Sequence, residues 1–242
     1  MAPDRRHDRE SLDASSGAID PSTSRRRGFV MNPGPVVIYL VDDDAAVRRG
    51  IEQLLEAHGM SVMSFPNAQA YLSHARSDSA ACLLLDLELP GIDGLDLQER
   101  LNAGEGPPIV FISGRSDVAR TVRAMKAGAT EFLTKPVDPA QLLSAVEAAL
   151  AQDRRNRARN ADLSILQSRF EMLTPRERQV FPLILAGLRN KQAAAILGIS
   201  EITLQVHRGQ IMRKMCAPSF AELVRMGALL GIDSRPDGNE RD

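Results

Sequence analysis

The sequence predicts an α/β fold with a five-stranded parallel sheet, followed by a small all-α domain. Two observations carry this prediction. Between residues 36 and 150, short apolar runs rich in Val, Ile and Leu alternate with segments of helical period, as in β–α units whose strands are covered by helices on both faces. After residue 170 helix-start signals recur without such strand-like runs.

The first part of the chain is expected to contain five β–α units. The predicted strands are 36–41, 61–65, 81–86, 108–113 and 130–134, and the predicted helices are 45–58, 67–76, 94–103, 116–127 and 138–151. Gly59 and Gly128 stand just beyond the first and fourth helices, where a left-handed residue commonly ends a helix. Residues 151–170 are charged and lack Gly and Pro, so they either extend the fifth helix as a stiff arm or form a linker.

The second part of the chain is predicted to be helical throughout. Thr174, Pro175 and Glu177 combine an N-cap, a proline at the first helical position and a capping-box partner. The predicted helices begin at Thr174, run over 190–197, run from Ser200 to about Met215, and begin again at Ser219. Gly198 separates the middle two, and this helix-turn-helix pattern is expected to place its second helix in the DNA major groove.

These elements divide the chain into five segments. Residues 1–34 hold too little apolar surface to offset the entropy of ordering, so they are expected to form a disordered tail. The other expected segments are the α/β domain at 35–151, a linker at 152–169, the helix-turn-helix domain at 170–232 and a C-terminal tail at 233–242.

Charge is unevenly distributed along the 242 residues, whose net charge is -1. Residues 36–150 hold nine basic and sixteen acidic side chains, whereas residues 169–215 hold eight basic and three acidic ones. The basic segment favours a polyanionic partner, because neutralising phosphates releases counterions. The alternative is a solvated basic surface that has no partner.

The spacing of the cysteines and the length of the apolar runs indicate the cellular compartment of the protein. Cys82 and Cys216 lack the spacing of a zinc site, and we expect neither a metal nor a disulfide there. No apolar run approaches the roughly 18 residues of a membrane span, and no apolar signal core follows Arg25–Arg27. We therefore expect a cytoplasmic protein without membrane association.

Polar side chains mark the ends of the predicted strands. Asp42 and Asp43, Asp86 and Ser113 end three of them, and Lys135 follows the last, so strand geometry brings all five to one edge of the sheet. Crowded carboxylates repel one another unless a hard cation lies between them, and Mg²⁺ prefers oxygen ligands. Each residue alone also fits a helix cap or a turn, but their joint occurrence at successive strand ends favours a magnesium site.

Four runs of the first part resemble the receiver domain of two-component response regulators, which has a flavodoxin-like fold: YLVDDDAAVRR, LLLDLELPGIDG, FISGRSD and EFLTKP. The second part resembles the LuxR-type output domain of the FixJ/NarL subfamily over LTPRERQVFPLILAGLRNKQAAAILGISEITLQVHRGQIMRKM. The resemblance covers about residues 36–231, and its motifs are specific because each needs several residues in a fixed order.

The resemblance implies a role for each residue of the polar cluster. Asp86 would accept a phosphoryl group from a sensor histidine kinase as a carboxylate nucleophile. The implied magnesium ligands are Asp42, Asp43, Asp86 and the backbone carbonyl of Glu88. Lys135 and Ser113 would contact the phosphoryl oxygens, and Phe132 would be the aromatic residue that changes rotamer when Ser113 moves inward.

Six residues of the second part are candidates for contact with double-stranded DNA: Lys191, Thr203, His207, Arg208, Gln210 and Lys214. Positions 203, 207, 210 and 214 are three and four residues apart and share one helix face. Arg, Gln and Thr can read base edges, whereas Lys mostly contacts phosphate; His207 also fits an ordinary helix surface. Four apolar residues of the same helix are expected to face the core: Ile202, Val206, Ile211 and Met215.

The sequence thus favours a transcription regulator over an enzyme. The resemblance implies that phosphorylation by a histidine kinase promotes a homodimer through the fourth helix and fifth strand, around Val118–Lys126 and Glu131–Thr134. Two output domains would then bind two half-sites of promoter DNA. Two alternatives stay open. One is an aspartate-based phosphohydrolase, which also uses an aspartate, a lysine and Mg²⁺; the other is a DNA binder that works without phosphorylation and uses its first domain only to dimerise.

Overall fold

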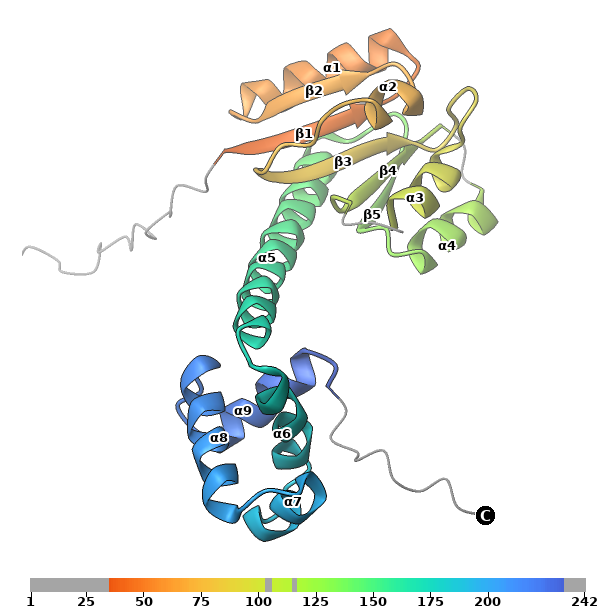
Figure 1. The fold of residues 1–242 in the computed structure, drawn as a ribbon. Helices are drawn as coiled ribbons and strands as arrows, with labels where there is room; N and C mark the ends of the chain where they lie inside the picture. The colour runs from red at the N-terminus through yellow and green to blue at the C-terminus, as the bar shows by residue number, and fades with distance from the viewer. Residues whose placement is uncertain (1–34, 103–105, 115–116, 233–242) are drawn as a thin grey trace, which may run out of the picture. The chain divides into compact units, whose positions relative to one another are not determined.

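Ten alternating strands and helices form the first part of the computed structural model, which describes residues 35–102, 106–114 and 117–232 (Figure 1). The tails expected at 1–34 and 233–242 lie outside the described residues. The elements are β1 (Val36–Val41), α1 (Ala45–Ala57), β2 (Ser61–Phe65), α2 (Ala68–Leu72), β3 (Ala80–Asp86), α3 (Gly94–Asn102), β4 (Ile109–Ser113), α4 (Val118–Lys126), β5 (Glu131–Thr134) and α5 (Pro139–Glu171). α2 is shorter than the predicted 67–76, and the other elements agree within a few residues over the described positions, apart from the longer α5. Positions 103 and 116, predicted as ends of two helices, lie outside the described residues.

The strands form one parallel sheet in the order β2-β1-β3-β4-β5. This confirms the predicted α/β fold. Val41 of β1 pairs with Leu85 of β3, and Ser113 of β4 pairs with Thr134 of β5. The register therefore places the residues at the carboxyl ends of β1, β3, β4 and β5 along one edge of the sheet.

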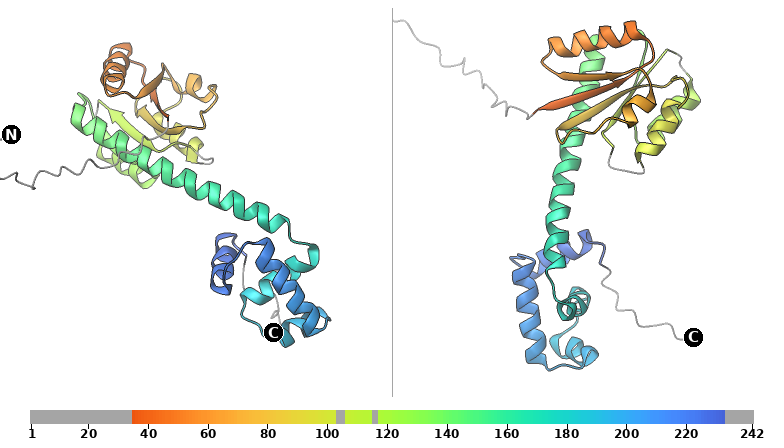
Figure 2. Two further views of the ribbon diagram at one scale, coloured as in Figure 1. Left: turned by 90° about the vertical axis from the view of Figure 1, so that its left-hand side faces the viewer. Right: turned by 45° about the horizontal axis from the view of Figure 1, so that its top comes forward.

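Helices cover both faces of the sheet (Figure 2). Tyr39 and Val41 of β1 pack in a cluster with residues of α2, α3 and α4, whereas Ile38 and Leu40 pack with residues of α1 and α5. Successive side chains of a strand point to opposite faces, so strands buried on both faces need an unbroken apolar run. That requirement explains the strand-like runs in the sequence.

Gly94, the first residue of α3, allows this helix to begin directly against the end of β3. A Cβ atom at this position would lie 2.5 Å from the carbonyl oxygen of Asp86 and 3.0 Å from the Cα of Leu87. The amide of Gly94 donates to the carbonyl of Leu87 over 3.2 Å. Backbone atoms cannot rotate out of the way, so a larger residue must displace α3 or the strand end.

Replacing Gly94 with alanine is expected to lower the free energy of unfolding of the α/β domain by about 2 kcal/mol, the usual cost of overpacking. Urea denaturation followed by tyrosine fluorescence measures this, because both tyrosines of the chain, Tyr39 and Tyr71, lie in this domain. Gly50→Ala is the control. A Cβ at Gly50, inside α1, would meet no heavy atom within 4 Å, so this change should stabilise by about 1 kcal/mol through helix propensity. Equal effects of the two changes would contradict the steric argument.

α5 settles the two alternatives for residues 151–170 in favour of continued helix, because it runs without interruption to Glu171. Buried residues in the first turns of α5, such as Leu142 and Val146, belong to the core between the sheet and the helices α1 and α5. Leu166, near the end of α5, belongs to the core of the C-terminal helices. Neither α5 nor any other helix in the described ranges is both long and apolar enough to cross a membrane.

Asp153 of α5 binds the beginning of β3. Its side chain accepts from the amide of Ala81 over 2.9 Å and from Nε of Arg157 over 2.6 Å. Arg157 Nη1 in turn donates to the carbonyl of Asp78 over 2.8 Å. Residues expected to lie in a linker thus contribute to the packing of the α/β domain.

Four further helices form the C-terminal part: α6 (Pro175–Leu185), α7 (Asn190–Leu197), α8 (Glu201–Lys214) and α9 (Phe220–Leu229). The capping box predicted at the start of α6 is present, since Thr174 Oγ1 accepts from the amide of Glu177 and Glu177 Oε2 accepts from the amide of Thr174. Gly198 adopts φ 65° between α7 and α8, which makes the tight turn. The predicted all-α helix-turn-helix domain is therefore confirmed.

Candidate functional site

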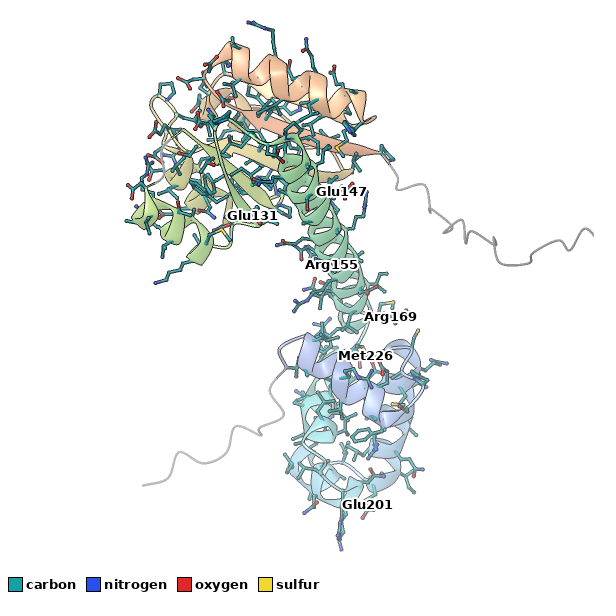
Figure 3. All side chains as sticks on the ribbon, turned by 180° about the vertical axis from the view of Figure 1, so that it is seen from behind. Glu131, Glu147, Arg155, Arg169, Glu201 and Met226 are labelled. Carbon is teal, nitrogen blue, oxygen red and sulfur yellow. The ribbon has the colours of Figure 1, made fainter. Side chains whose placement is uncertain are left out.

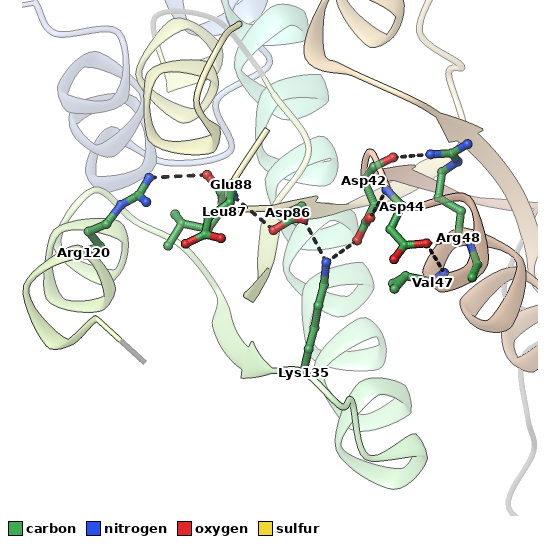
Figure 4. Close-up of polar contacts among 10 residues, drawn as sticks. Asp42, Asp44, Val47, Arg48, Asp86, Leu87, Glu88, Arg120 and Lys135 are labelled. Atoms are coloured by element: carbon green, nitrogen blue, oxygen red, sulfur yellow. Dashed lines mark hydrogen bonds and ion pairs between the residues drawn. The ribbon is translucent and has the colours of Figure 1, made fainter. Parts of the chain in front are cut away.

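The polar residues predicted at the strand ends lie at one edge of the sheet. Asp42 and Asp43 follow β1, Asp86 ends β3, Ser113 ends β4 and Lys135 follows β5. Figure 4 shows the side chain of Lys135 reaching between Asp42 and Asp86. The parallel topology, which aligns the carboxyl ends of the strands, brings these distant residues together.

Lys135 bridges the two buried carboxylates. Its Nζ donates to Oδ2 of Asp42 over 2.7 Å and to Oδ2 of Asp86 over 2.8 Å. The amide of Lys135 also donates to the carbonyl of Ser113 over 2.7 Å, so the segment after β5 is fixed to the end of β4. Asp42 and Ser113 are fully buried and Asp86 nearly so.

The other carboxylate oxygens hold the loops in place. Asp42 Oδ1 accepts from the amide of Asp44 over 2.8 Å, and Asp86 Oδ1 accepts from the amide of Glu88 over 3.1 Å. Asp44 is the residue that caps α1, with its side chain accepting from the amides of Ala46 and Val47. Helix capping is therefore the role of Asp44, and Asp42 points to Lys135 instead.

Burial and ion pairing shift the pKa values of Asp42 and Lys135 in opposite directions. Burial raises the pKa of Asp42 above its ordinary value, although the hydrogen bond from Lys135 acts to lower it. Burial would lower the pKa of Lys135, but its hydrogen bonds to Asp42 and Asp86 hold that pKa above its ordinary value. The lysine is thus firmly protonated, and one ammonium group faces several carboxylates.

The acidic residues fit a hard divalent cation. One carboxylate oxygen from each of Asp42, Asp43 and Asp86 lies within 4.8 Å of the others, and an all-oxygen set of this kind is what Mg²⁺ prefers. A single lysine leaves the cluster with excess negative charge, which a divalent ion would neutralise. The backbone carbonyl of Glu88 stays a predicted ligand.

Ser113 ends β4, and Phe132 lies in the neighbouring strand β5. Phe132 of β5 is half-buried and contacts the ring of Phe111, with the ring centroids 6.3 Å apart. It packs against the cluster that also contains residues of α2, α3 and α4. The switch roles of both residues remain predictions.

The six candidates for DNA contact differ in their surroundings. Lys191 and Thr203 are exposed, whereas His207 and Gln210 are half-buried. Arg208 Nη1 donates to Oδ1 of Asn190 over 2.9 Å, and its guanidinium carbon lies 5.3 Å from the centre of the Phe220 ring. Both contacts hold Arg208 against its own domain.

Two residues expected in the core of the C-terminal domain are exposed instead. Ile202 is 77% and Val206 57% exposed, whereas Ile211 and Met215 are fully buried as expected. Ile202 and Ile211 are nine residues apart, as are Val206 and Met215. About 3.6 residues make one turn, so nine residues place two side chains on opposite sides of the helix. The expectation for Ile202 and Val206 was wrong because it placed these two residues on the same face of α8 as Ile211 and Met215.

Lys214 forms an ion pair inside the C-terminal domain. Its Nζ donates to Oε2 of Glu177 over 2.6 Å, and Glu177 is only 4% exposed. Burial would raise the pKa of Glu177, but the hydrogen bonds from Lys214 and from the amide of Thr174 lower it below its ordinary value. The pair joins α8 to the start of α6.

Replacing Lys214 with methionine is expected to destabilise the C-terminal domain by about 2 kcal/mol, because Glu177 then lies buried without its counter-ion.

In the parent protein, the depressed pKa of Glu177 adds stability that is fully present above pH 4.5, the ordinary glutamate value, and is lost as the pH falls through the lower value of the folded state. The difference between parent and variant should therefore shrink under acid. Hydrogen exchange of α6 and α8 amides measures it, with exposed Lys191→Met as control; a pH-independent difference would contradict this account.

Comparisons with known proteins agree with both halves of the structure. Residues 38–147 match the response regulator receiver domain, and residues 171–227 match the bacterial regulatory proteins of the luxR family. Nodulation protein W of Bradyrhizobium diazoefficiens is 44% identical over 199 residues, which is 82% of this chain and 88% of that protein. The transcriptional regulatory protein FixJ of the same organism is 39% identical over 196 residues, covering 81% and 96% of the two chains.

A solved structure supports the same assignment. The low-resolution structure of the response regulator StyR is 43% identical and matches with a TM-score of 0.68, covering 80% of this chain and 98% of that one. The similarity thus spans the sheet domain and the helical domain together. The chain belongs to the two-component response regulators of the FixJ/NarL subfamily, which are transcription regulators with a receiver domain and a LuxR-type DNA-binding domain.

Proposed function

We propose that a sensor histidine kinase phosphorylates Asp86 of this regulator, and that phosphorylation promotes dimerisation and promoter binding. The observation that carries the proposal is the position of Asp86. It ends β3, its Oδ2 contacts Lys135, and it lies beside Asp42 and Asp43 in a cluster with excess negative charge. Such a cluster can accept a phosphoryl group only if positive charge offsets the anionic donor.

In the proposed transfer, a carboxylate oxygen of Asp86 attacks phosphorus in line. The new oxygen–phosphorus bond forms as the bond from phosphorus to the histidine nitrogen of the kinase breaks, and that nitrogen keeps the electron pair. Lys135 then moves its hydrogen bond from Asp86 to a phosphoryl oxygen, and the Ser113 hydroxyl donates to the same group. Mg²⁺, held by Asp42, Asp43, Asp86 and the carbonyl of Glu88, would supply further charge neutralisation when bound.

A change at Ser113 would reach the dimer surface through Phe132. Phe132 lies in β5, next to α4, and three aliphatic or sulfur-containing side chains of α4 are exposed: Val118, Val122 and Met125. They are three and four residues apart and therefore share one face of the helix. We assign this α4–β5 face to the homodimer. Phosphorylation then shifts a pre-existing equilibrium, so the unmodified protein dimerises weakly.

The dimer would bring two helix-turn-helix domains to two half-sites of double-stranded DNA. Lys191 and Thr203 are exposed and are proposed to contact DNA directly. His207 and Gln210 of α8 are half-buried and stay candidates for such contact. Arg208 and Lys214 contact Asn190 and Glu177. Their proposed part in binding is to hold α8 in position.

Incubation with acetyl phosphate and Mg²⁺ tests the phosphorylation step. We expect a stable adduct of about 80 Da, the mass of one phosphoryl group, on the peptide that contains Asp86. Asp86→Asn should show no adduct. Phosphate release over many turnovers without an adduct would favour the phosphohydrolase instead.

DNA binding tests the regulatory step. Phosphorylation of the parent protein should tighten binding to promoter DNA, and Asp86→Asn should keep the weak binding of the unmodified state. Equal binding and promoter activation by Asp86→Asn and the phosphorylated parent would favour the alternative in which phosphorylation has no role.

A further inference from the structure

The recognition helix α8 presents apolar side chains to solvent where a surface helix normally carries polar ones. Ile202 is 77% and Val206 57% exposed. Gly209 follows on the next turn, and a Cβ at that position would meet nothing within 4 Å. We call Ile202, Val206 and Gly209 the apolar stripe.

The stripe points away from the core of its domain. At about 100° per residue, its three positions lie within about 60° of one another around the helix axis. Leu204 and Ile211, on the other side of α8, are fully buried. Figure 3 marks the beginning of this helix at Glu201, the residue before Ile202. The stripe therefore begins in the first turn of α8, the part of a recognition helix that contacts base edges.

Singly scattered exposed aliphatic residues are ordinary, but Ile202 and Val206 lie one turn apart on the same face of α8, and neighbouring exposed apolar side chains favour a binding surface. The surroundings identify its occupant as DNA. The segment 169–215 carries five more basic than acidic residues, eight against three. Lys191 and Arg189 near the start of α7 and Arg213 near the end of α8 are exposed. This excess of basic side chains attracts phosphates, although the exposed Glu201 at the start of α8 is acidic, and it disfavours a second copy that carries the same excess charge.

We propose that the apolar stripe reads the methyl groups of thymine in the major groove. The C5 methyl is the apolar group that thymine presents there, and aliphatic side chains contact it. Ile202 and Val206 can bury such methyls, and Gly209 lets the DNA approach the helix closely because it has no side chain. Exposed Gln205 lies beside Val206, and glutamine pairs with the N6 and N7 atoms of adenine. Both features select A·T pairs. This proposal rests on the proposed DNA-binding function and specifies its target.

The test uses DNA in which the methyl groups can be removed one at a time. The phosphorylated full chain first selects its tightest duplex from a randomised library. Each thymine in the half-sites is then replaced by deoxyuridine, which differs only by the methyl group. We expect a three- to fivefold loss of affinity at one or two positions per half-site, the effect of leaving one methyl unburied. In Ile202→Ala or Val206→Ala, the loss at the corresponding position should vanish.

Ile196→Ala is the matched control, because Ile196 is also exposed, at 60%, but lies on α7. It should keep the full sensitivity to deoxyuridine. Insensitivity of the parent protein to every such replacement, with tight binding retained, would overturn the proposal while leaving DNA binding intact. A change of dimer affinity in Ile202→Ala, with unchanged discrimination, would also overturn it. If no duplex is enriched at all, the proposed DNA-binding function itself fails.

Discussion

Lys135→Met is expected to destabilise the receiver domain by about 3 kcal/mol in the absence of metal. Lys135 Nζ contacts both Asp42 and Asp86, and the Asp42 side chain is fully buried. Removing one partner of a buried ion pair costs more than the pair itself contributes, since the other charge stays buried without compensation. Urea denaturation followed by tyrosine fluorescence, in the presence of a chelator, measures the loss.

The same change is expected to tighten Mg²⁺ binding and to slow phosphorylation. Without the ammonium group, the carboxylates of Asp42, Asp43 and Asp86 attract a divalent ion more strongly, and we expect roughly tenfold tighter binding from the Coulomb energy at this range. Phosphorylation of Asp86 should fall by a factor on the order of 100, as when a preorganised donor to a developing charge is removed. Calorimetric titration with Mg²⁺ and adduct formation with acetyl phosphate give the two values.

Lys126→Met is the control, because it removes the same charge from the exposed end of α4. It should leave stability, Mg²⁺ affinity and phosphorylation close to those of the parent protein. If Lys126→Met tightened Mg²⁺ binding as much as Lys135→Met, the effect would come from net charge and not from the contacts of Lys135. Wild-type phosphorylation in Lys135→Met would show that this lysine does not assist transfer.

The cluster at the sheet edge was predictable because a parallel sheet converts positions in sequence into neighbours in space. Asp42, Asp86 and Lys135 are far apart along the chain, yet each stands where an apolar run ends. Strand ends are visible in a sequence, since burial on both faces demands unbroken apolar runs. The pairing of Lys135 with two carboxylates at once needed the structure, because it depends on how far the lysine side chain reaches across the edge.

Which apolar residues of α8 are exposed was harder to predict, although their spacing along the sequence indicated it. Ile202 and Val206 stand nine residues before Ile211 and Met215, and helical geometry places such pairs on opposite sides. Lys214 gave no such signal. Its partner Glu177 lies 37 residues earlier, on another helix, so only the packing of α6 against α8 reveals that this lysine pairs inside the domain.

The beginning of β3 depends on Asp153, which is 5% exposed and 72 residues away from its partner Ala81. The carboxylate accepts from the Ala81 amide and from Arg157, and Arg157 also donates to the Asp78 carbonyl. In the same segment, the Ser77 amide donates to the hydroxyl of Tyr39 over 2.9 Å. Asp153 and Arg157 thus fasten α5 to the strand that carries Asp86 at its other end.

Asp153→Ala is therefore expected to lower the free energy of unfolding of the receiver domain by about 3 kcal/mol, because it leaves a buried amide without a partner and removes the counter-ion of Arg157. Asp153→Asn keeps an acceptor for Ala81 but not the charge, so it should cost about 1 kcal/mol. Tyrosine emission reports the global transition, and Tyr39 also reports release of the 77–81 segment. Arg155→Ala, an exposed position on the same helix (Figure 3), is the control and should have little effect. Equal stability of Asp153→Ala and Arg155→Ala would mean that α5 is held to the sheet by its apolar residues alone.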